Sequence, residues 1–195
     1  MTRNQRSRSA KYEMAARLLW DKGVREFVEA ARLLRDRRVQ VRFALVGIPD
    51  PGNPESVGDE QLIRWEAEGI VEIWGFRSDI ANVFAMAHVV ALPSFYGEGV
   101  PKVLIEASAC GRAIVTTDMP GCRDAIVPTV SGLLVPPRDQ VALANAIQRL
   151  LENPSLRASM GKAGRELAER EFSIEKVVAT HLAVYQSLMG IPLKR

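Results

Sequence analysis

Residues His88–Thr116, HVVALPSFYGEGVPKVLIEASACGRAIVT, decide the fold of this chain. The apolar run His88–Leu92 is rich in β-branched residues and predicts a buried strand that Pro93 ends. After a glycine-containing loop, Pro101–Cys110 predicts a helix, because proline is tolerated in the first helical turn. A second apolar strand is predicted at Ala113–Thr116. This order predicts two parallel strands joined by a helical crossover.

The same alternation extends in both directions along the chain. Further strands are predicted at Val41–Val46, Val71–Ile73 and Gly132–Val135, with a weaker first strand at Tyr12–Leu18. Helical spacing of apolar residues predicts helices at Val24–Arg37, Arg138–Glu152, Pro154–Phe172 and Ile174–Met189. The pattern predicts an α/β fold: a single domain with a doubly wound, Rossmann-like parallel sheet that helices cover on both faces.

Sheets of this kind bind ligands beyond the carboxyl ends of their strands. The strand-to-helix loops expected at that edge are Leu19–Gly23, Trp74–Asp79, Pro93–Pro101 and Thr117–Asp124. These four loops are therefore the candidates for a binding site.

The third loop carries the most informative chemistry. Gly97 and Gly99 flank Glu98, and small residues let a ligand approach the backbone. Pro101 then opens a helix, whose free amides and dipole favour a phosphate or diphosphate. Glu106 lies further along this helix, where a carboxylate can hold the paired hydroxyls of a ribose. Taken alone, glycines before a helix more often form a turn that binds nothing.

Composition narrows the classes of protein. A chain of 195 residues with 25% charged and 47% hydrophobic residues fits one globular core. The net charge of +3 fits an anionic small ligand or a membrane surface as well as nucleic acid, so it does not separate these partners. No apolar stretch is long enough to span a bilayer. Cys110 and Cys122 form neither a disulfide framework nor a metal-binding pattern. Residues 1–11 are expected to form a flexible arm, and residues 12–190 the domain.

Several motifs together resemble one enzyme family. Glu98 and Glu106 form a Glu-x7-Glu pair similar to the motif of the family 4 retaining glycosyltransferases, which have the two-domain GT-B fold. Arg17-Leu18-x3-Lys22-Gly23 resembles the family's Gly-Arg-Leu-x3-Lys-Gly loop. Other segments that resemble it are Phe43–Gly47, Trp74–Phe76, Ala87–Ser94, Gly132–Pro137 with Asp139, and Glu171–Ser173. Because the likeness runs in order from about residue 12 to residue 189, the chain is identified as similar to the C-terminal half of such an enzyme.

The resemblance implies a donor site for a nucleotide diphosphate sugar, most often UDP-linked, that works without a bound metal or other cofactor. Arg17 and Lys22 would hold the diphosphate and stabilise the charge that develops on it, and Glu98 would contact the sugar hydroxyls. These three are the expected catalytic residues, and Glu106 would hold the ribose. The other donor-binding residues that the resemblance implies are Phe76, Arg77, Gly97, Gly99, Val100, Pro101 and Lys102.

Some of these residues also have a simpler structural interpretation. Arg17 and Lys22 could be ordinary surface cations, since lysine and arginine are mostly exposed. Arg77 could form a local ion pair with Asp79, worth under ~1 kcal/mol. His88 stands where relatives usually carry aspartate, and it is expected to be structural.

The sequence departs from the family pattern at a few positions. Ala16 replaces a glycine, Val100 replaces a larger residue, and Pro120–Asp124 stands where many relatives have Gly-Gly-x-x-Glu. The last variant resembles a bacterial subset that builds surface polysaccharides or lipopolysaccharides on lipid-linked acceptors.

The resemblance also implies partners. A preceding acceptor-binding domain would complete the enzyme, and the helix Ile174–Met189 would brace it. Expected partners are the nucleotide-sugar donor, that domain, and a lipid-linked or saccharide acceptor, with no nucleic acid. The expected location is the cytoplasm, at the inner face of the cytoplasmic membrane. Without the preceding domain the chain is expected to be inactive.

Two other functions are open at this point. The chain could be a nucleotide-sugar-binding module without transferase activity. A dehydrogenase is disfavoured, because no G-x-G-x-x-G follows the first predicted strand.

Overall fold

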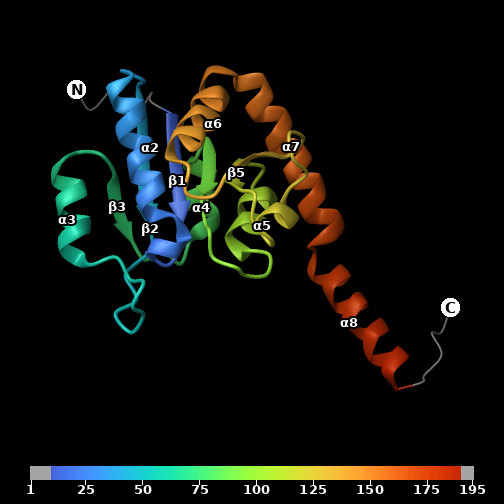
Figure 1. Cartoon of the computed structure of the whole chain (residues 1–195). Coiled ribbons are helices and arrows are strands. Elements are labelled where there is room, and N and C mark those ends of the chain that lie inside the picture. Colours follow the sequence, from blue (N-terminus) through green and yellow to red (C-terminus); the bar gives the residue numbers. More distant parts are fainter. Residues whose placement is uncertain (1–9, 190–195) are drawn as a thin grey trace.

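A computed structural model describes residues 10–189, and a six-stranded parallel sheet forms its centre (Figure 1). The strands are β1 Ala10–Ala15, β2 Val41–Val46, β3 Glu72–Gly75, β4 Val89–Leu92, β5 Ala113–Thr117 and β6 Gly132–Val135. They lie in the order β3-β2-β1-β4-β5-β6, and all neighbours pair in parallel. The strand order reverses between β1 and β4, which confirms the predicted doubly wound sheet.

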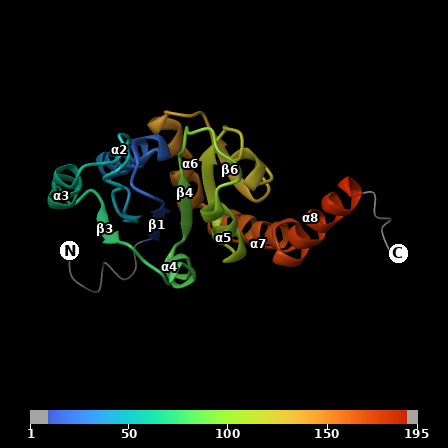
Figure 2. The same cartoon turned by 90° about the horizontal axis from the view of Figure 1, so that it is seen from below.

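Helices cover both faces of this sheet. They are α2 Val24–Asp36, α3 Asp59–Ala67, α4 Ile80–Met86, α5 Lys102–Ala109, α6 Gln140–Glu152, α7 Pro154–Glu171 and α8 Ile174–Leu188, with short 3-10 turns η1 Trp20–Lys22 and η2 Arg123–Ala125. Figure 2 shows α2 and α6 on one face and α4 and α5 on the other. Because all neighbouring strands are parallel, each crossover returns the chain to the edge of the sheet where the strands begin.

The core explains why these segments form these elements. Every residue of β4 and β5 is buried, as expected for central strands covered on both sides. On α2 the buried residues Phe27, Ala31 and Leu34 recur at helical spacing. The buried stripe of α6 is formed by Leu143, Ala144, Ile147 and Leu150. Burial of these apolar stripes against the sheet is what selects a helix there.

Most predicted elements are confirmed, and β1 is the main correction. The predicted strand Tyr12–Leu18 was wrong at both ends, because β1 spans Ala10–Ala15. Beyond Ala15 the chain bends into the loop that carries Arg17 and Lys22. Ala10 and Lys11, assigned to the flexible arm, belong to this strand, while residues 1–9 of the arm lie outside the described residues. Helices α3 and α4 were not predicted, since each buries only two side chains.

Helix α8 differs from the others, because none of its side chains is buried. Figures 1 and 2 show it extending away from the sheet beyond α7. Its exposed apolar residues are Ile174, Val177, Val178, Leu182, Val184, Tyr185 and Leu188. Among the described residues, no helix is both long and apolar enough to cross a membrane.

Candidate functional site

Two of the predicted loops touch each other at the carboxyl edge of the sheet. The amide of Phe95, after β4, donates to the carbonyl of Asp21, after β1, over 2.9 Å. Gly23 closes the same contact: its φ is +81°, and a Cβ there would lie 2.1 Å from the carbonyl oxygen of Pro93. Only glycine allows both the left-handed conformation and this approach. The loop that carries Lys22 is thereby fixed against the loop that carries Glu98.

A third predicted loop supports the same segment. Gly121 has a φ of +77°, and a Cβ there would lie 2.4 Å from the carbonyl oxygens of both Glu98 and Gly99. The hydroxyl of Thr117 donates to the carbonyl of Ser94. The loops after β1, β4 and β5 therefore form one continuous structure, as their position on neighbouring strands predicted.

A cavity of about 330 Å³ opens beside these loops, at the point where the strand order reverses. It brings together five of the predicted site residues from segments far apart in the sequence: Arg17, Phe76, Arg77, Lys102 and Glu106. Its apolar lining comes from Ala15, Val46, Ile48, Ile80 and Val103. The cavity thus combines an apolar floor with charged groups at its sides, which is typical of small-molecule sites.

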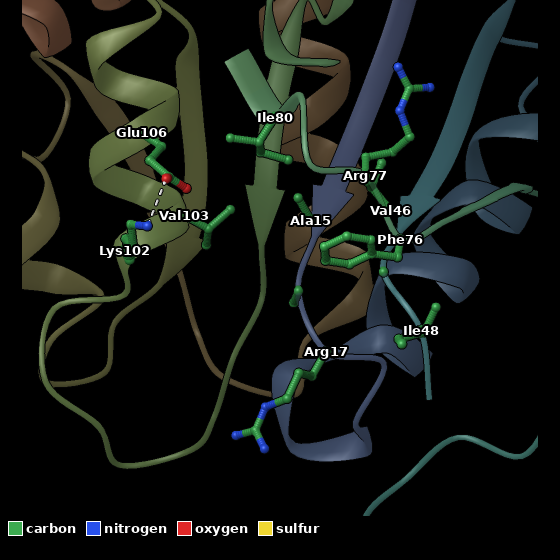
Figure 3. A pocket seen from close by; sticks show the side chains of 12 residues that line it. Ala15, Arg17, Val46, Ile48, Phe76, Arg77, Ile80, Lys102, Val103 and Glu106 are labelled. Atoms are coloured by element: carbon green, nitrogen blue, oxygen red, sulfur yellow. Dashed lines mark ion pairs between the residues drawn. The ribbon is translucent and has the colours of Figure 1, made fainter. Parts of the chain in front are cut away.

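Figure 3 shows how the two sides of the cavity differ. Helix α5 presents Glu106 and Lys102 on one side, and the loop after β3 presents the exposed ring of Phe76 on the other. Ala15, at the end of β1, lies between them. A planar group held near Phe76 could therefore extend toward the carboxylate of Glu106.

Lys22 and Glu98 form an ion pair in the adjoining loops. The side chain of Lys22 is only 11% exposed, and its ammonium lies 5.1 Å from the centre of the Tyr96 ring. The surface-cation interpretation is therefore wrong for Lys22. Arg17 is more exposed, at 61% of its side chain, and it lines the cavity.

The remaining predicted residues do not line the cavity. Gly97, Gly99, Val100 and Pro101 lie with Glu98 in the loop that leads into α5, and Lys22 lies on η1, next to this loop. A Cβ at Gly97 or Gly99 would meet nothing within 4 Å. The space in front of these two glycines is therefore open to a ligand.

Three other cations of this edge are also paired with carboxylates. Arg17 contacts Asp50 at 2.9 Å, and Lys102 contacts Glu106 at 3.3 Å. Arg77 contacts Asp79 at 2.6 Å, which confirms the predicted local ion pair. Hydrogen bonds from this guanidinium lower the pKa of Asp79 to about 2. An anionic ligand at this edge would take over partners that the carboxylates now hold.

Glu13 is a buried carboxyl that sequence reasoning missed. It lies on β1, two residues before Ala15, so both side chains face the same side of the sheet. Within the described residues neither of its oxygens has a hydrogen-bond partner. Burial raises the pKa of Glu13 to about 7, against the opposing influence of Lys11 and Arg77. The sequence signal that could have pointed to Glu13 is an acidic residue inside the predicted strand Tyr12–Leu18.

The loop after β2 was missed as well. It supplies Ile48 to the cavity and Asp50 to Arg17. Because β2 pairs directly with β1, the loop that follows it must lie at the same edge. The sheet order, once predicted, would have pointed to it.

His88 and the cysteines have structural surroundings. The Nδ1 atom of His88 accepts a hydrogen bond from the amide of Lys11, which fits the structural role expected of it. Both cysteines are free thiols, and Cys122 is buried. Residues 10–189 contain no cluster of three or more His, Cys, Asp or Glu side chains placed to hold a metal ion.

Comparisons with known proteins give the same picture of the fold. The sequence model of the family described as "Glycosyl transferases group 1" matches residues 4–167. The chain is 40% identical over 149 residues to N,N'-diacetylbacillosaminyl-diphospho-undecaprenol alpha-1,3-N-acetylgalactosaminyltransferase of Campylobacter jejuni, covering 76% of this chain and 37% of that protein. It is 38% identical over 170 residues to D-inositol 3-phosphate glycosyltransferase of Saccharomonospora viridis, covering 83% and 38%.

Among solved structures, HepE of Anabaena in complex with UDP superposes with a TM-score of 0.80 at 25% identity. This match covers 98% of the chain and 54% of HepE. The chain thus spans about half the length of that structure and less than half of the two curated relatives.

Proposed function

This chain belongs to the glycosyl transferases group 1 family, and we propose that it forms the half of such an enzyme that binds the sugar donor. The proposed donor is a nucleotide diphosphate sugar, with UDP as the nucleotide. One observation carries the proposal: residues of four distant segments line a single cavity at the reversal point of the sheet. Ligands of doubly wound sheets bind at this point.

The cavity suggests how the nucleotide lies. The exposed ring of Phe76 offers a surface for the base. Across the cavity, Glu106 accepts hydrogen bonds from the ribose hydroxyls, and charged hydrogen bonds of this kind are worth about 1.5–3 kcal/mol. The diphosphate then lies near the open glycine loop and the amino end of α5, where free amides and the helix dipole favour an anion.

Lys22 and Arg17 carry the chemistry in this proposal. As the bond between the sugar and the diphosphate breaks, negative charge grows on the departing phosphate. Lys22 is held in place by its surroundings, so it can stabilise this charge with little rearrangement. Glu98, released from Lys22, contacts the sugar hydroxyls. These two cations supply the charge stabilisation without a bound metal ion.

The rest of the proposed reaction needs a second domain. An acceptor hydroxyl must lie within about 3–3.5 Å of the reacting carbon, and this chain offers only the donor side of such a site. We propose that the apolar side chains of α8 pack against a preceding domain that binds the acceptor. We further propose a saccharide or lipid-linked acceptor, a role in bacterial surface polysaccharide synthesis, and transfer with retention, which NMR of the product's anomeric proton tests.

The donor proposal is tested by calorimetric titration of the chain with UDP, with and without EDTA. We expect weak binding that EDTA leaves unchanged, because amides and side chains hold the phosphates. Glu106→Ala should weaken this binding by roughly ten- to a hundredfold, the equivalent of a charged hydrogen bond.

The matched control is Glu166→Ala. Glu166 also receives a lysine four residues before it, as Glu106 does, but it lies on α7 away from the cavity. Equal UDP affinity of the wild type and the Glu106→Ala variant would contradict the ribose assignment. A strict metal requirement would contradict the roles of Arg17 and Lys22.

A further inference from the structure

A second cavity lies at the opposite, amino edge of the sheet. It has a volume of about 330 Å³ and is lined by His88, Gly111, Arg112, Pro154, Arg157 and Ala158. His88 and Arg112 directly precede β4 and β5, and Pro154 begins α7. The length of the strands separates this cavity from the proposed donor site.

Two guanidinium groups of this cavity are held by uncharged acceptors. Arg112 donates to the carbonyls of Cys110 and Ala87 over 2.9 and 3.0 Å. Arg157 donates to the carbonyl of Leu150 over 2.8 Å. These carbonyls belong to the ends of α5, α4 and α6, where a cation is favourable. The bonds fix both guanidinium groups but do not balance their charge.

Among residues 10–189, neither Arg112 nor Arg157 has a carboxylate within ion-pair distance. Glu13 is an acidic group whose field reaches Arg112, and its own burial keeps much of it protonated at neutral pH. Each guanidinium has five N–H donors, so several remain for a ligand.

His88 and α7 add further donors to the same cavity. The Nδ1 atom of His88 accepts a hydrogen bond, so in the neutral ring Nε2 carries the proton and can donate. Burial lowers the pKa of His88 most, and the positive charges of Arg157, Arg112 and Lys11 lower it further. At the start of α7, Asn153 directs its side-chain amide to the carbonyl of Arg149 instead of capping the helix. The first-turn amides of α7 therefore lack a side-chain acceptor.

We propose that this cavity binds a phosphate monoester, whose dianionic group lies between Arg112 and Arg157 and accepts a hydrogen bond from His88. A dianion matches two fixed guanidinium groups in charge, and the fork of each guanidinium suits phosphate oxygens. The volume leaves room for an organic group attached to the phosphate. The ligand is either a soluble phosphorylated molecule or the headgroup of a lipid.

The two histidines of the chain provide a direct test by NMR. His88 lies in the cavity, and His181 on α8 is an exposed internal control. We expect glycerol 3-phosphate to raise the pKa of His88, because a bound dianion offsets the neighbouring guanidinium charges. The imidazole signals of His181 should not respond to the ligand. Phosphate bound at the donor edge would not reach His88, so this outcome is independent of the proposed function.

Variants and sources complete the experiment. Arg157→Gln should weaken the affinity for glycerol 3-phosphate, measured through the His88 signals, at least tenfold. Arg149→Gln, which removes an exposed charge outside the cavity, should change this affinity less than twofold. If Arg157→Gln unfolds, Arg157→Lys keeps the charge and should still weaken binding. If the chain co-sediments with phosphatidic acid vesicles and Arg157→Gln abolishes this co-sedimentation, the phosphate ligand is a lipid headgroup. Responses of His88 and His181 that are equal, or that sodium chloride reproduces at the same ionic strength, would overturn the proposal.

Discussion

The two proposed sites, which lie at opposite edges of the sheet, hold their cations in opposite ways. At the carboxyl edge, Lys22, Arg17 and Lys102 each contact a carboxylate. At the amino edge, Arg112 and Arg157 contact only backbone carbonyls among the described residues. Both edges border a cavity of similar size. The difference lies in what must happen before an anion can bind.

In the donor site that we propose at the carboxyl edge, an incoming anion replaces an acidic partner that is already present. The cation is then held in place before the ligand arrives, and the released carboxylate becomes available to the ligand's hydroxyls. At the amino edge no carboxylate has to be displaced, so the fixed guanidinium groups can bind an anion directly. The comparison therefore separates a site arranged for chemistry from a site arranged for binding.

The largest expected effect comes from removing Lys22, the most buried of these cations. In an enzyme that contains the preceding domain, Lys22→Ala should lower kcat by ~10²-fold or more, the scale for loss of a fixed group that stabilises a developing anion. KM for the donor should change much less, because the amides still hold the diphosphate. Steady-state kinetics with a labelled donor measures both values.

Lys162→Ala is the control for this prediction, since it removes an exposed lysine of α7 that also has a glutamate partner. If Lys22→Ala raised KM and left kcat unchanged, Lys22 would only bind the donor. The carboxyl edge would then be a binding site like the amino edge.

The sequence predicts the fold well, because buried apolar residues recur at the spacing of a helix or a strand. β2 and β6 have the predicted bounds. Both ends of α2 and of α6 lie within two residues of the ends predicted for these helices. The end of β1 was missed because apolar residues continue to Leu18, although the chain leaves the sheet after Ala15. Leu18 is buried by the loop rather than by a strand, and spacing alone does not separate these cases.

The site was predicted less completely. The glycine loop and Glu106 are local features, so the sequence pointed to them. The partners Asp50 and Tyr96 depend on how separate loops approach one another, which no local pattern encodes. The amino-edge cavity was missed for the same reason: Arg112 and Arg157 are 45 positions apart and meet only through the packing of α7 near β5.

Glu13, on the central strand, sharpens the comparison because its carboxyl has no partner at all among the described residues. Its pKa is about 7 in the folded chain against an ordinary value of 4.5, so the folded state holds a proton more tightly than the unfolded state. The contribution of Glu13 to stability is therefore fully present below pH 4.5 and decreases as the pH rises to 7. Relative to Glu13→Gln, the wild type should lose about 3 kcal/mol over this range, measured by urea unfolding.

Glu72 is the control of opposite sign. Burial alone would raise its pKa, but hydrogen bonds from Arg42 and Trp74 lower it below the usual value. Its contribution is present above pH 4.5 and disappears as the pH falls through the lowered pKa. Glu72→Gln should therefore cost stability at neutral pH. If Glu13→Gln and the wild type showed parallel pH profiles, the carboxyl of Glu13 would have a partner in solution.

The smallest effect is expected at Lys102, the most exposed cation of the carboxyl edge. Its side chain is 87% exposed, and its contact with Glu106 is an exposed pair four residues apart on α5. Such pairs contribute about 0.2–0.5 kcal/mol, so Lys102→Ala should hardly change the unfolding free energy. UDP affinity should change less than about threefold, because the proposal assigns the phosphates to the amide of Lys102 rather than to its ammonium. Lys162→Ala, which removes the matching lysine of α7, sets the background for both measurements.

A loss of UDP affinity above tenfold in Lys102→Ala alone would make this ammonium a direct phosphate ligand. In that case an ion pair with a carboxylate would not distinguish the cations whose side chains bind the donor from those whose side chains do not. The contrast between the two edges would then depend on Lys22 alone.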